Sequence, residues 1–368
     1  MRSRRVLRQI TPGLVAGSLL LASAACSSAT QSSTTQPSAS SGAGATLDAA
    51  GLPKPELQNV TAGLLESVNH PVDIARYDNL FQKYGVTLKI ENFTSDSNEV
   101  DALLAGQIQI ALNVGNAALL ASQLTSTTLE SVYIGQTNID DNMYAVQSIK
   151  TGPELTGHSI AVSSFASVTY GEALIALQQL HLTPSQVTIT AIGDDAQRTA
   201  ALVAGSVGAS LNDKAEAPQM NARGLHVLVP LSQLANADFP AGNTAIPKSF
   251  VQKYPNTVLA IVAALTEGTH LFLTDSALAI KAGEVEEGMT ASASTQQVQY
   301  DLQGWRPDNG YMKLSDYQEQ QVIYEKSDPQ LKSVNPADAI DDQFINELKT
   351  DGFDQKNGIP VNCNGCGP

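Results

Sequence analysis

The chain has 368 residues, of which 42% are hydrophobic and 15% charged, and its formal net charge is −15. The first 25 residues hold four arginines and no acidic residue, so the chain without them carries −15 − 4 = −19. Such an acidic chain excludes nucleic acid and anionic lipid surfaces as electrostatic partners. Its length is sufficient for two lobes with sizeable cores.

Residues 1–25 predict an export signal. Arginines at the start are followed by an apolar stretch at residues 14–25, which is too short to span a bilayer. Small residues then precede Cys26, as in the lipobox of bacterial lipoproteins, where the cysteine is lipidated. An ordinary signal peptide is the alternative, and the sequence does not decide between Sec and twin-arginine export.

Residues 26–55 are rich in Ser, Thr, Ala and Gly, a composition that predicts a flexible tether. A lipid on Cys26 would hold the following domain at the outer face of the cytoplasmic membrane. At the other end, Cys363 and Cys366 lie in a predicted tail, residues 351–368. We expect a local disulfide there because exported cysteines meet oxidising conditions, with a free tail as the alternative.

The first part of the folded region alternates between strand and helix patterns. In chain order we predict a strand at 60–65, a helix at 71–84, a strand at 86–91, a helix at 97–105, a strand at 108–112, a helix starting near 116, and further strand at 133–147. This alternation predicts a largely parallel sheet that is covered by helices on both faces.

The next part repeats this plan, and helices dominate after it. We predict strands at 159–163, 187–192, 207–211 and 225–230, and helices at 169–180, 196–204, 256–273, 276–287, 315–326 and 338–348. Thr169 and Glu172 have the spacing of a capping box at the start of their helix. The late helices are expected to return to the first lobe.

A sequence repeat supports two similar lobes. Residues 102–113 (ALLAGQIQIALN) return 99 residues later as residues 201–212 (ALVAGSVGASLN). Each copy has the end of an apolar helix, a glycine, a short buried strand and a polar turn. One repeated unit of this length favours two α/β lobes over a solenoid, and ligands commonly bind between lobes.

The predicted division of the chain follows from this plan. Lobe 1 is expected from residues 56–145 plus 246–350, and lobe 2 from residues 146–245. Two segments would then cross between the lobes, near residues 144–149 and 242–247, and a double crossing of this kind forms a hinge.

Four polar turns, each after a strand and before a helix, are the candidate ligand site. Open α/β sheets bind ligands at such turns, where helix N-termini present backbone N–H groups. We predict ligand contacts from Asn69, His70, Asn113, Gly115, Asn116, Ser163, Ser164, Ser167, Thr169, Asn212 and Asp213.

Local roles remain open for several of these residues. The hydroxyls of Ser164, Ser167 and Thr169 could cap their own helix, and Asn113 could satisfy local turn carbonyls. The Asp213 carboxylate suits an amine or a ring N–H better than an anion, although Arg198 and His70 could offset it.

No convincing catalytic constellation is present in the sequence. The five histidines are scattered, and there is no Gly-x-Ser-x-Gly elbow or phosphate-binding loop. Adjacent acids at 140–141 and 194–195 are typical of solvated turns. We therefore expect no enzyme activity, no cofactor and no metal site.

Four segments carry a resemblance to a known family: residues 80–88, 102–111, 160–164 and 335–344. Over roughly residues 57–350, the chain resembles the solute-binding proteins of nitrate, taurine and aliphatic-sulfonate ABC importers, a group that includes thiamine-pyrimidine precursor binders. This resemblance implies the two-lobed periplasmic-binding-protein type II fold. It also implies hinge closure on a small organic or oxyanion solute, delivery to an ABC permease and ATPase complex, and action as a monomer.

Two alternatives stay open. The chain could be a sensing or scaffold lipoprotein without a transporter. It could also be an enzyme similar to pyrimidine synthases of this fold, which consume a histidine and a bound pyridoxal cofactor; His70 and Lys214 lie in predicted ligand turns, but export argues against this reading. The turn at 67–71 and the scarcity of arginine depart from the familiar members. The solute, its charge and affinity, the permease and the envelope type are therefore open.

Overall fold

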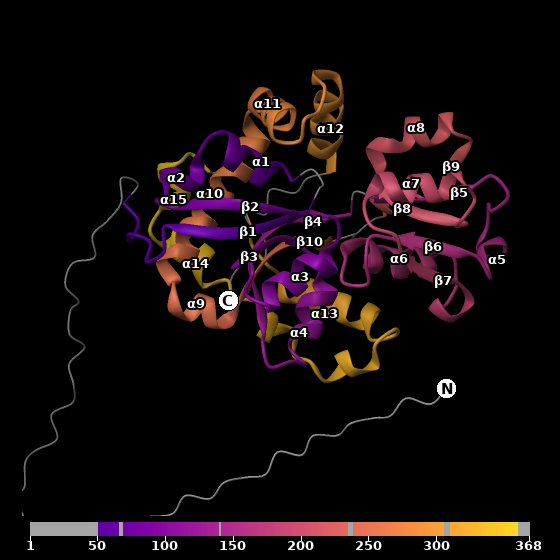
Figure 1. The fold of residues 1–368 in the computed structure, drawn as a ribbon, viewed down its shortest axis with the longest axis horizontal. Coiled ribbons are helices and arrows are strands. Elements are labelled where there is room, and N and C mark those ends of the chain that lie inside the picture. Colours follow the sequence, from indigo (N-terminus) through magenta and orange to yellow (C-terminus); the bar gives the residue numbers. More distant parts are fainter. Residues whose placement is uncertain (1–50, 66–68, 140, 235–237, 305–309, 360–368) are drawn as a thin grey trace, which may run out of the picture. The chain divides into compact units, whose positions relative to one another are not determined.

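The structure is a computed structural model that describes residues 51–65, 69–139, 141–234, 238–304 and 310–359. These residues belong to one compact unit, which spans residues 45–368. It is built on two five-stranded sheets with helices on their faces (Figure 1). Cys26, Cys363 and Cys366 lie outside the described residues, and their predicted roles stay predictions.

The first sheet has the strand order β2-β1-β3-β10-β4. Strands β2, β1 and β3 are parallel, whereas β10 is antiparallel to both β3 and β4. The bounds are β1 (Asn59–Leu65), β2 (Thr87–Phe93), β3 (Ile110–Val114), β4 (Leu129–Asn138) and β10 (Asp238–Pro247). We call this sheet and the helices packed on it the first lobe.

The second sheet repeats that order as β7-β6-β8-β5-β9. Here β5 is the antiparallel strand, between β8 and β9. The bounds are β5 (Asp141–Val146), β6 (Ser159–Val162), β7 (Thr188–Ala191), β8 (Ala209–Asp213) and β9 (Leu225–Val229). This sheet with its helices is the second lobe, and the predicted two-lobed α/β fold is confirmed.

The antiparallel strand of each sheet arrives from the other sheet. β5 follows β4, the last parallel strand of the first sheet, and β10 follows β9 of the second. The predicted crossings near 144–149 and 242–247 were therefore wrong, because β5 of the second sheet already begins at Asp141 and β10 of the first sheet already begins at Asp238. The run at 133–147 looked like one strand but divides between two sheets, and β10 carries two prolines and a glycine that hid its strand pattern.

The first sheet is covered on both faces, because alternate residues of its strands point to opposite sides. Ile110 and Leu112 pack with α1 (His70–Tyr77), α2 (Leu80–Lys83), α10 (Pro255–Thr274) and α14 (Gln343–Thr350). Ala111 and Val114 pack with α3 (Asp96–Leu104), α4 (Asn116–Ser122) and α13 (Leu314–Tyr324) on the other side. The late helices thus return to the first lobe (Figure 1).

The remaining helices have less to do with the first sheet. α11 (Ser276–Glu286) and α12 (Ala291–Gly304) share a small apolar cluster with α1 and α10. α9 (Lys248–Lys253) follows β10, and α15 (Phe353–Lys356) follows α14. α10 is the one described helix that is long and apolar enough to cross a membrane, but 72% of its apolar window is buried, as in the core helix of a folded domain.

The second lobe carries α5 (Gly152–Leu155), α6 (Val168–Gln179), α7 (Asp195–Val203) and α8 (Ala217–Ala222). α7 and α8 cover one face of its sheet. On the other face, α6 joins the apolar cluster that also contains α4 and α13. One continuous core cluster therefore includes residues of both lobes, and it places the start of α6 close to the first lobe.

The repeat corresponds to one structural unit present twice. α3 and α7 begin 99 residues apart (195 − 96), and β3 and β8 also begin 99 apart (209 − 110). Gly106 and Gly205 end the two helices with φ angles of +72° and +69°, which only glycine adopts without strain. The sequence repeat therefore predicted the backbone correctly.

Several local predictions were wrong. The helix at 71–84 is interrupted by Asn79, whose φ of 55° is left-handed. Thr169 and Glu172 form no capping box, because Ser167 is the N-cap and accepts from the backbone N–H of Tyr170. The helix expected at 338–348 begins at Gln343, after a short 3-10 turn at 336–339. α12 was not predicted, because its apolar positions are few.

Candidate functional site

In the first lobe, Asn69 and His70 form the start of α1. The Asn69 side chain caps the helix by accepting from Val72, 3.5 Å away. His70 is buried, and its ring stacks on Phe272 with centroids 4.3 Å apart. Its Nε2 lies 2.7 Å from a carboxylate oxygen of Asp301 in α12. The neighbouring residues 66–68 lie outside the described part.

The second predicted group of the first lobe follows β3. Asn113 has a φ of 100°, which is unusual for a residue other than glycine. Gly115 is the N-cap residue of α4. Asn116 is 1% exposed; its Oδ1 accepts from Asn243 at 2.7 Å, and its Nδ2 has no hydrogen-bond partner in the described chain.

In the second lobe, the predicted hydroxyl cluster organises the turn between β6 and α6. Thr169 Oγ1 accepts from the Ser163 N–H at 2.9 Å and lies 2.8 Å from Ser167 Oγ. Ser167 Oγ donates to the Ser164 carbonyl at 2.6 Å, while Ser164 Oγ accepts from Ala166 at 3.3 Å. These contacts hold the turn in place.

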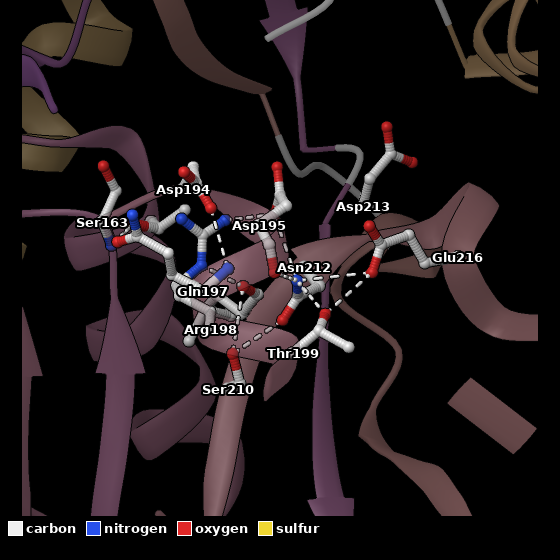
Figure 2. Close-up of polar contacts among 12 residues, drawn as sticks. Ser163, Asp194, Asp195, Gln197, Arg198, Thr199, Ser210, Asn212, Asp213 and Glu216 are labelled. Atoms are coloured by element: carbon white, nitrogen blue, oxygen red, sulfur yellow. Dashed lines mark hydrogen bonds and ion pairs between the residues drawn. The ribbon is translucent and has the colours of Figure 1, made fainter. Parts of the chain in front are cut away.

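Asn212, at the end of β8, lies inside a network within the second lobe (Figure 2). Its Nδ2 contacts Thr199 at 3.1 Å and the Asp195 carboxylate at 3.2 Å, and its Oδ1 accepts from Ser210 at 2.6 Å. Asp213 lies apart from this network, as its carboxylate accepts from Ala215 and from Gln297 of α12 at 2.7 Å each.

Predicted residues take part in three described contacts between the lobes. Ser163 donates to the carboxylate of Asp96, the first residue of α3, at 3.3 Å. Gly115 lies so close to residues 166–168 that a Cβ there would stand 2.7 Å from their backbone atoms. Gln297 connects Asp213 of the second lobe to Asp301, 3.1 Å away, and through it to His70.

Arg198 of α7 is the buried cation of the second-lobe network, with 4% exposure. Its Nε donates to the Leu211 carbonyl at 2.9 Å, and its other nitrogens contact the Gly193 carbonyl and the Asp195 carboxylate. Because its donors are committed to these groups, Arg198 organises the end of β8.

Carboxyl groups around this region have raised pKa values. Burial raises the pKa of Asp96 to about 6, against opposing hydrogen bonds from Ser163 and Gly115. Burial raises the pKa of Glu172 in α6 to about 7 despite a hydrogen bond with Asp141. Burial and the charge of Asp195 raise the pKa of Glu216 to about 7. The site is therefore rich in carboxyl groups that ionise near neutral pH.

Sequence reasoning missed Asp96, Glu172, Gln297 and Asp301. Asp96 carried a signal, since it follows a strand and opens a helix, as the predicted turns do. Glu172 interrupts the apolar face of its helix, but the capping-box interpretation concealed it. Gln297 and Asp301 lie one turn apart on α12, which was not predicted.

Within the described residues, no three His, Cys, Asp or Glu side chains are grouped as a metal site. The polar groups that meet between the lobes provide hydrogen-bond acceptors from carboxylates and donors from amides and hydroxyls. Groups of this kind are able to bind a small polar ligand through hydrogen bonds and charge.

A comparison with protein families matches residues 53–284, more than half of the chain, to the NMT1-like family. A comparison with curated proteins returned no match.

Solved structures with the same fold include proteins of different function. A periplasmic nitrate-binding protein from Synechocystis PCC 6803 has 13% identity and a TM-score of 0.69, over 84% of this chain and 92% of its own. An alkanesulfonate-binding protein from Xanthomonas axonopodis pv. citri, bound to MOPS, has 18% identity and a TM-score of 0.65, over 78% of this chain and 99% of its own. A desulfurization enzyme has 14% identity and a TM-score of 0.57, over 80% of this chain and 99% of its own. At these identities the likeness establishes the fold alone.

Proposed function

Because the chain belongs to the NMT1-like family, we propose that it is the solute-binding lipoprotein of an ABC importer. It captures a small solute between its two lobes and delivers it to a membrane permease. The observation that carries this proposal is the pair of sheets with matching strand order, joined by two crossing segments and bridged by polar contacts. Nitrate-binding and alkanesulfonate-binding proteins share this architecture.

Hinge closure is the proposed mechanism. The two passages of the chain between the sheets, from β4 to β5 and from β9 to β10, act as the hinge, and we place the lobe limits there, in place of those predicted near 145 and 245. A solute stabilises the closed arrangement only if it gains contacts from both lobes. One lobe supplies residues at or just after the ends of β1 and β3, namely Asn69, His70, Asn113, Gly115 and Asn116. The other supplies residues at or just after the ends of β6 and β8, namely Ser163, Ser164, Ser167, Thr169, Asn212 and Asp213.

The test is a thermal-shift screen of the chain with Cys26→Ser, which removes the lipid-bearing thiol. The probes are sodium nitrate, taurine, MOPS, pyrimidines, aromatic acids and amines. A probe at roughly a thousandfold over its Kd adds ~4 kcal/mol to the native state, which raises the melting temperature by several degrees. If no probe raises the melting temperature of a well-folded sample, the result contradicts capture of these solutes and favours a sensor or scaffold.

The site itself is tested with the probe that binds. Because each lobe must hold the solute, Asn113→Ala and Asp213→Ala should each weaken affinity by more than about threefold, ~0.7 kcal/mol. If both variants bind within that limit, the proposed contacts are misplaced.

Anchoring at Cys26 is the second part of the proposal. The lipobox and the following tether support an extracytoplasmic chain that is attached to the cell membrane by its lipid. Wild-type protein should fractionate with membranes, whereas Cys26→Ser should appear in the soluble fraction after export. Equal membrane association of both would contradict the lipid anchor.

We do not propose catalysis. The pyrimidine-synthase-like alternative requires a histidine that is consumed, and His70 is 3% exposed, stacked on Phe272 and bonded to Asp301. That environment holds the His70 ring in the chain of contacts that ends at Asp213, which suits a fixed binding residue and not a histidine that is consumed.

A further inference from the structure

Asp96 and Asp195 occupy equivalent places in the two lobes. They are the first residues of α3 and α7, and they are 99 residues apart. Asp195 forms an ion pair with Arg198, three residues later. The residue equivalent to Arg198 in the first lobe is Glu99 (198 − 99). α3 therefore provides no cation for Asp96 where α7 provides one for Asp195.

The carboxylate of Asp96 is buried and only partly satisfied. It is 2% exposed, and it accepts from its own backbone N–H, from Ser163 at 3.3 Å and from the Gly115 backbone. Its Oδ1 has no hydrogen-bond partner among the described residues. Arg198 attracts it through space, but the guanidinium is bonded to Leu211, Gly193 and Asp195. A buried carboxylate oxygen without a hydrogen-bond donor is costly. The described part of the chain supplies no donor for Oδ1 of Asp96.

Glu172 provides a second such oxygen from the other lobe. It is 1% exposed and hydrogen-bonded to Asp141, but its Oε2 has no partner within the described chain. The hydroxyl of Tyr324, from α13, is also buried without a partner there, and the charges of Glu172 and Asp96 both raise the pKa of this phenol. The Tyr324 hydroxyl occupies the space that a Cβ on Gly171 would need, beside Glu172, and Ser163, which lies just before α6, holds Asp96. The three groups thus come from α6, α13 and α3 and lie around the start of α6.

We propose that the solute is an organic cation, and that its ammonium or amidinium N–H groups bind Asp96 and Glu172 as the lobes close. The bound cation supplies to Asp96 the positive charge that Arg198 supplies to Asp195. This inference rests on the proposed function, since it names the solute class of the same site. Tyr324 and Tyr170 stack with ring centroids 6.2 Å apart, and such rings favour a neighbouring cation.

Other ligand charges fit this region poorly. Glu172 is hydrogen-bonded to Asp141 and feels the charges of Asp195 and Asp213, which the charge of Arg198 opposes. A sulfonate or nitrate would be repelled by this set of carboxylates. A metal ion would need further ligands, and the described residues include no group of three that could hold one.

The raised pKa values give the proposal a pH signature. The groups that interact with Glu172 and Asp96 include Glu99, Asp141, Ser163, Asp195, Arg198, Asp213 and Tyr324. The pKa of Asp96 is about 6 and that of Glu172 about 7. Both carboxyls must ionise to hold a cation, so affinity should rise from pH 5.5 to pH 8 and binding should release protons.

The experiment is calorimetry on the Cys26→Ser chain with matched probes. Benzamidinium and n-butylammonium chlorides are compared with sodium benzenesulfonate, sodium butanesulfonate and zinc chloride. The organic cations should bind at least tenfold more tightly at pH 8 than at pH 5.5, with proton release seen as a heat that depends on the buffer. Asp96→Asn and Glu172→Gln should each weaken binding at least tenfold, whereas the exposed controls Asp101→Asn and Glu319→Gln should not.

Each outcome is decisive. Binding of a sulfonate but no cation overturns this inference and leaves the importer proposal intact. Binding of zinc alone, reversed by a chelator, also overturns it. Binding of no probe overturns it and counts against the importer proposal as well. Should a variant fail to fold, the pH dependence and proton release of the wild type decide the matter.

Discussion

In the first copy of the repeat, the Glu99 carboxylate accepts from the backbone N–H of Leu112 at 3.0 Å. At the equivalent place in the second copy, Arg198 donates to the Leu211 carbonyl at 2.9 Å. Both side chains connect the helix to the strand that follows it, but with opposite charge types. Burial and the nearby charge of Asp96 raise the pKa of Glu99 well above its usual range, so the first copy favours a neutral acid where the second holds an ion pair.

The ends of the two strands differ in the same way. After β3, the backbone of Asn113 is left-handed and Gly115 lies against the other lobe. After β8, Asn212 is enclosed by its own lobe and Lys214 stands at the place of Gly115 (214 − 99). A shared backbone therefore carries two different polar chemistries: the second copy satisfies its own groups, and the first leaves Asp96 and Asn116 with unpartnered atoms.

The largest effect is expected for Arg198→Leu. Removing the guanidinium leaves the Leu211 and Gly193 carbonyls and the Asp195 carboxylate without their donor. Breaking a buried pair costs about 3–5 kcal/mol, and the lower end applies because the Asp195 side chain is 38% exposed. Urea denaturation measures the loss. The equivalent variant, Glu99→Gln, should lose far less, and equal losses would contradict the contrast between the copies.

Asp96→Asn should stabilise the unliganded chain as pH rises. Burial raises the pKa of Asp96 from 3.8 in the unfolded chain to about 6 in the folded chain. As the pH rises from 3.8 to 6, this carboxyl ionises in the unfolded chain before it does so in the folded chain, so the wild type loses stability over that range. A shift of about two units corresponds to about 3 kcal/mol. The variant should match the wild type most closely below pH 3.8 and exceed it at pH 8. Asp195→Asn should behave oppositely and destabilise at pH 8, because it breaks the ion pair with Arg198.

Gly115→Ala should disturb the contact between the lobes. The added methyl would stand 2.7 Å from backbone atoms of residues 166–168, which cannot move aside as a side chain can. Overpacking of this kind costs about 1–3 kcal/mol. The expected result is a lower melting temperature and a larger radius of gyration by X-ray scattering. Lys214→Ala is the matched control at the equivalent position; a comparable effect there would remove the special role of Gly115.

The repeat shows how far sequence could predict this molecule. Helix stop, glycine and buried strand recur with the same spacing, and apolar periodicity with a glycine signal determines such local structure. The two lobes and the places of Asn113 and Asn212 were therefore predictable. The partners were not: Asp301 and Gln297 reach the site from a helix far along the chain, and the contact between Asp96 and Ser163 depends on how the lobes pack. Tertiary contacts of this kind leave no local pattern.

The smallest effect is expected for Asn113→Gly, and its sign is opposite to that of its counterpart. The φ of 100° at Asn113 is strained for a residue with a Cβ, so glycine relieves strain at that position. The greater freedom of glycine in the unfolded chain opposes this gain. The net stabilisation should be under about 1 kcal/mol, seen as a small rise in the urea midpoint. Asn212→Gly should instead lower the midpoint, because Ser210 and Thr199 lose a buried partner. A loss in both variants would mean that the Asn113 side chain contributes more to the fold than its backbone strain costs.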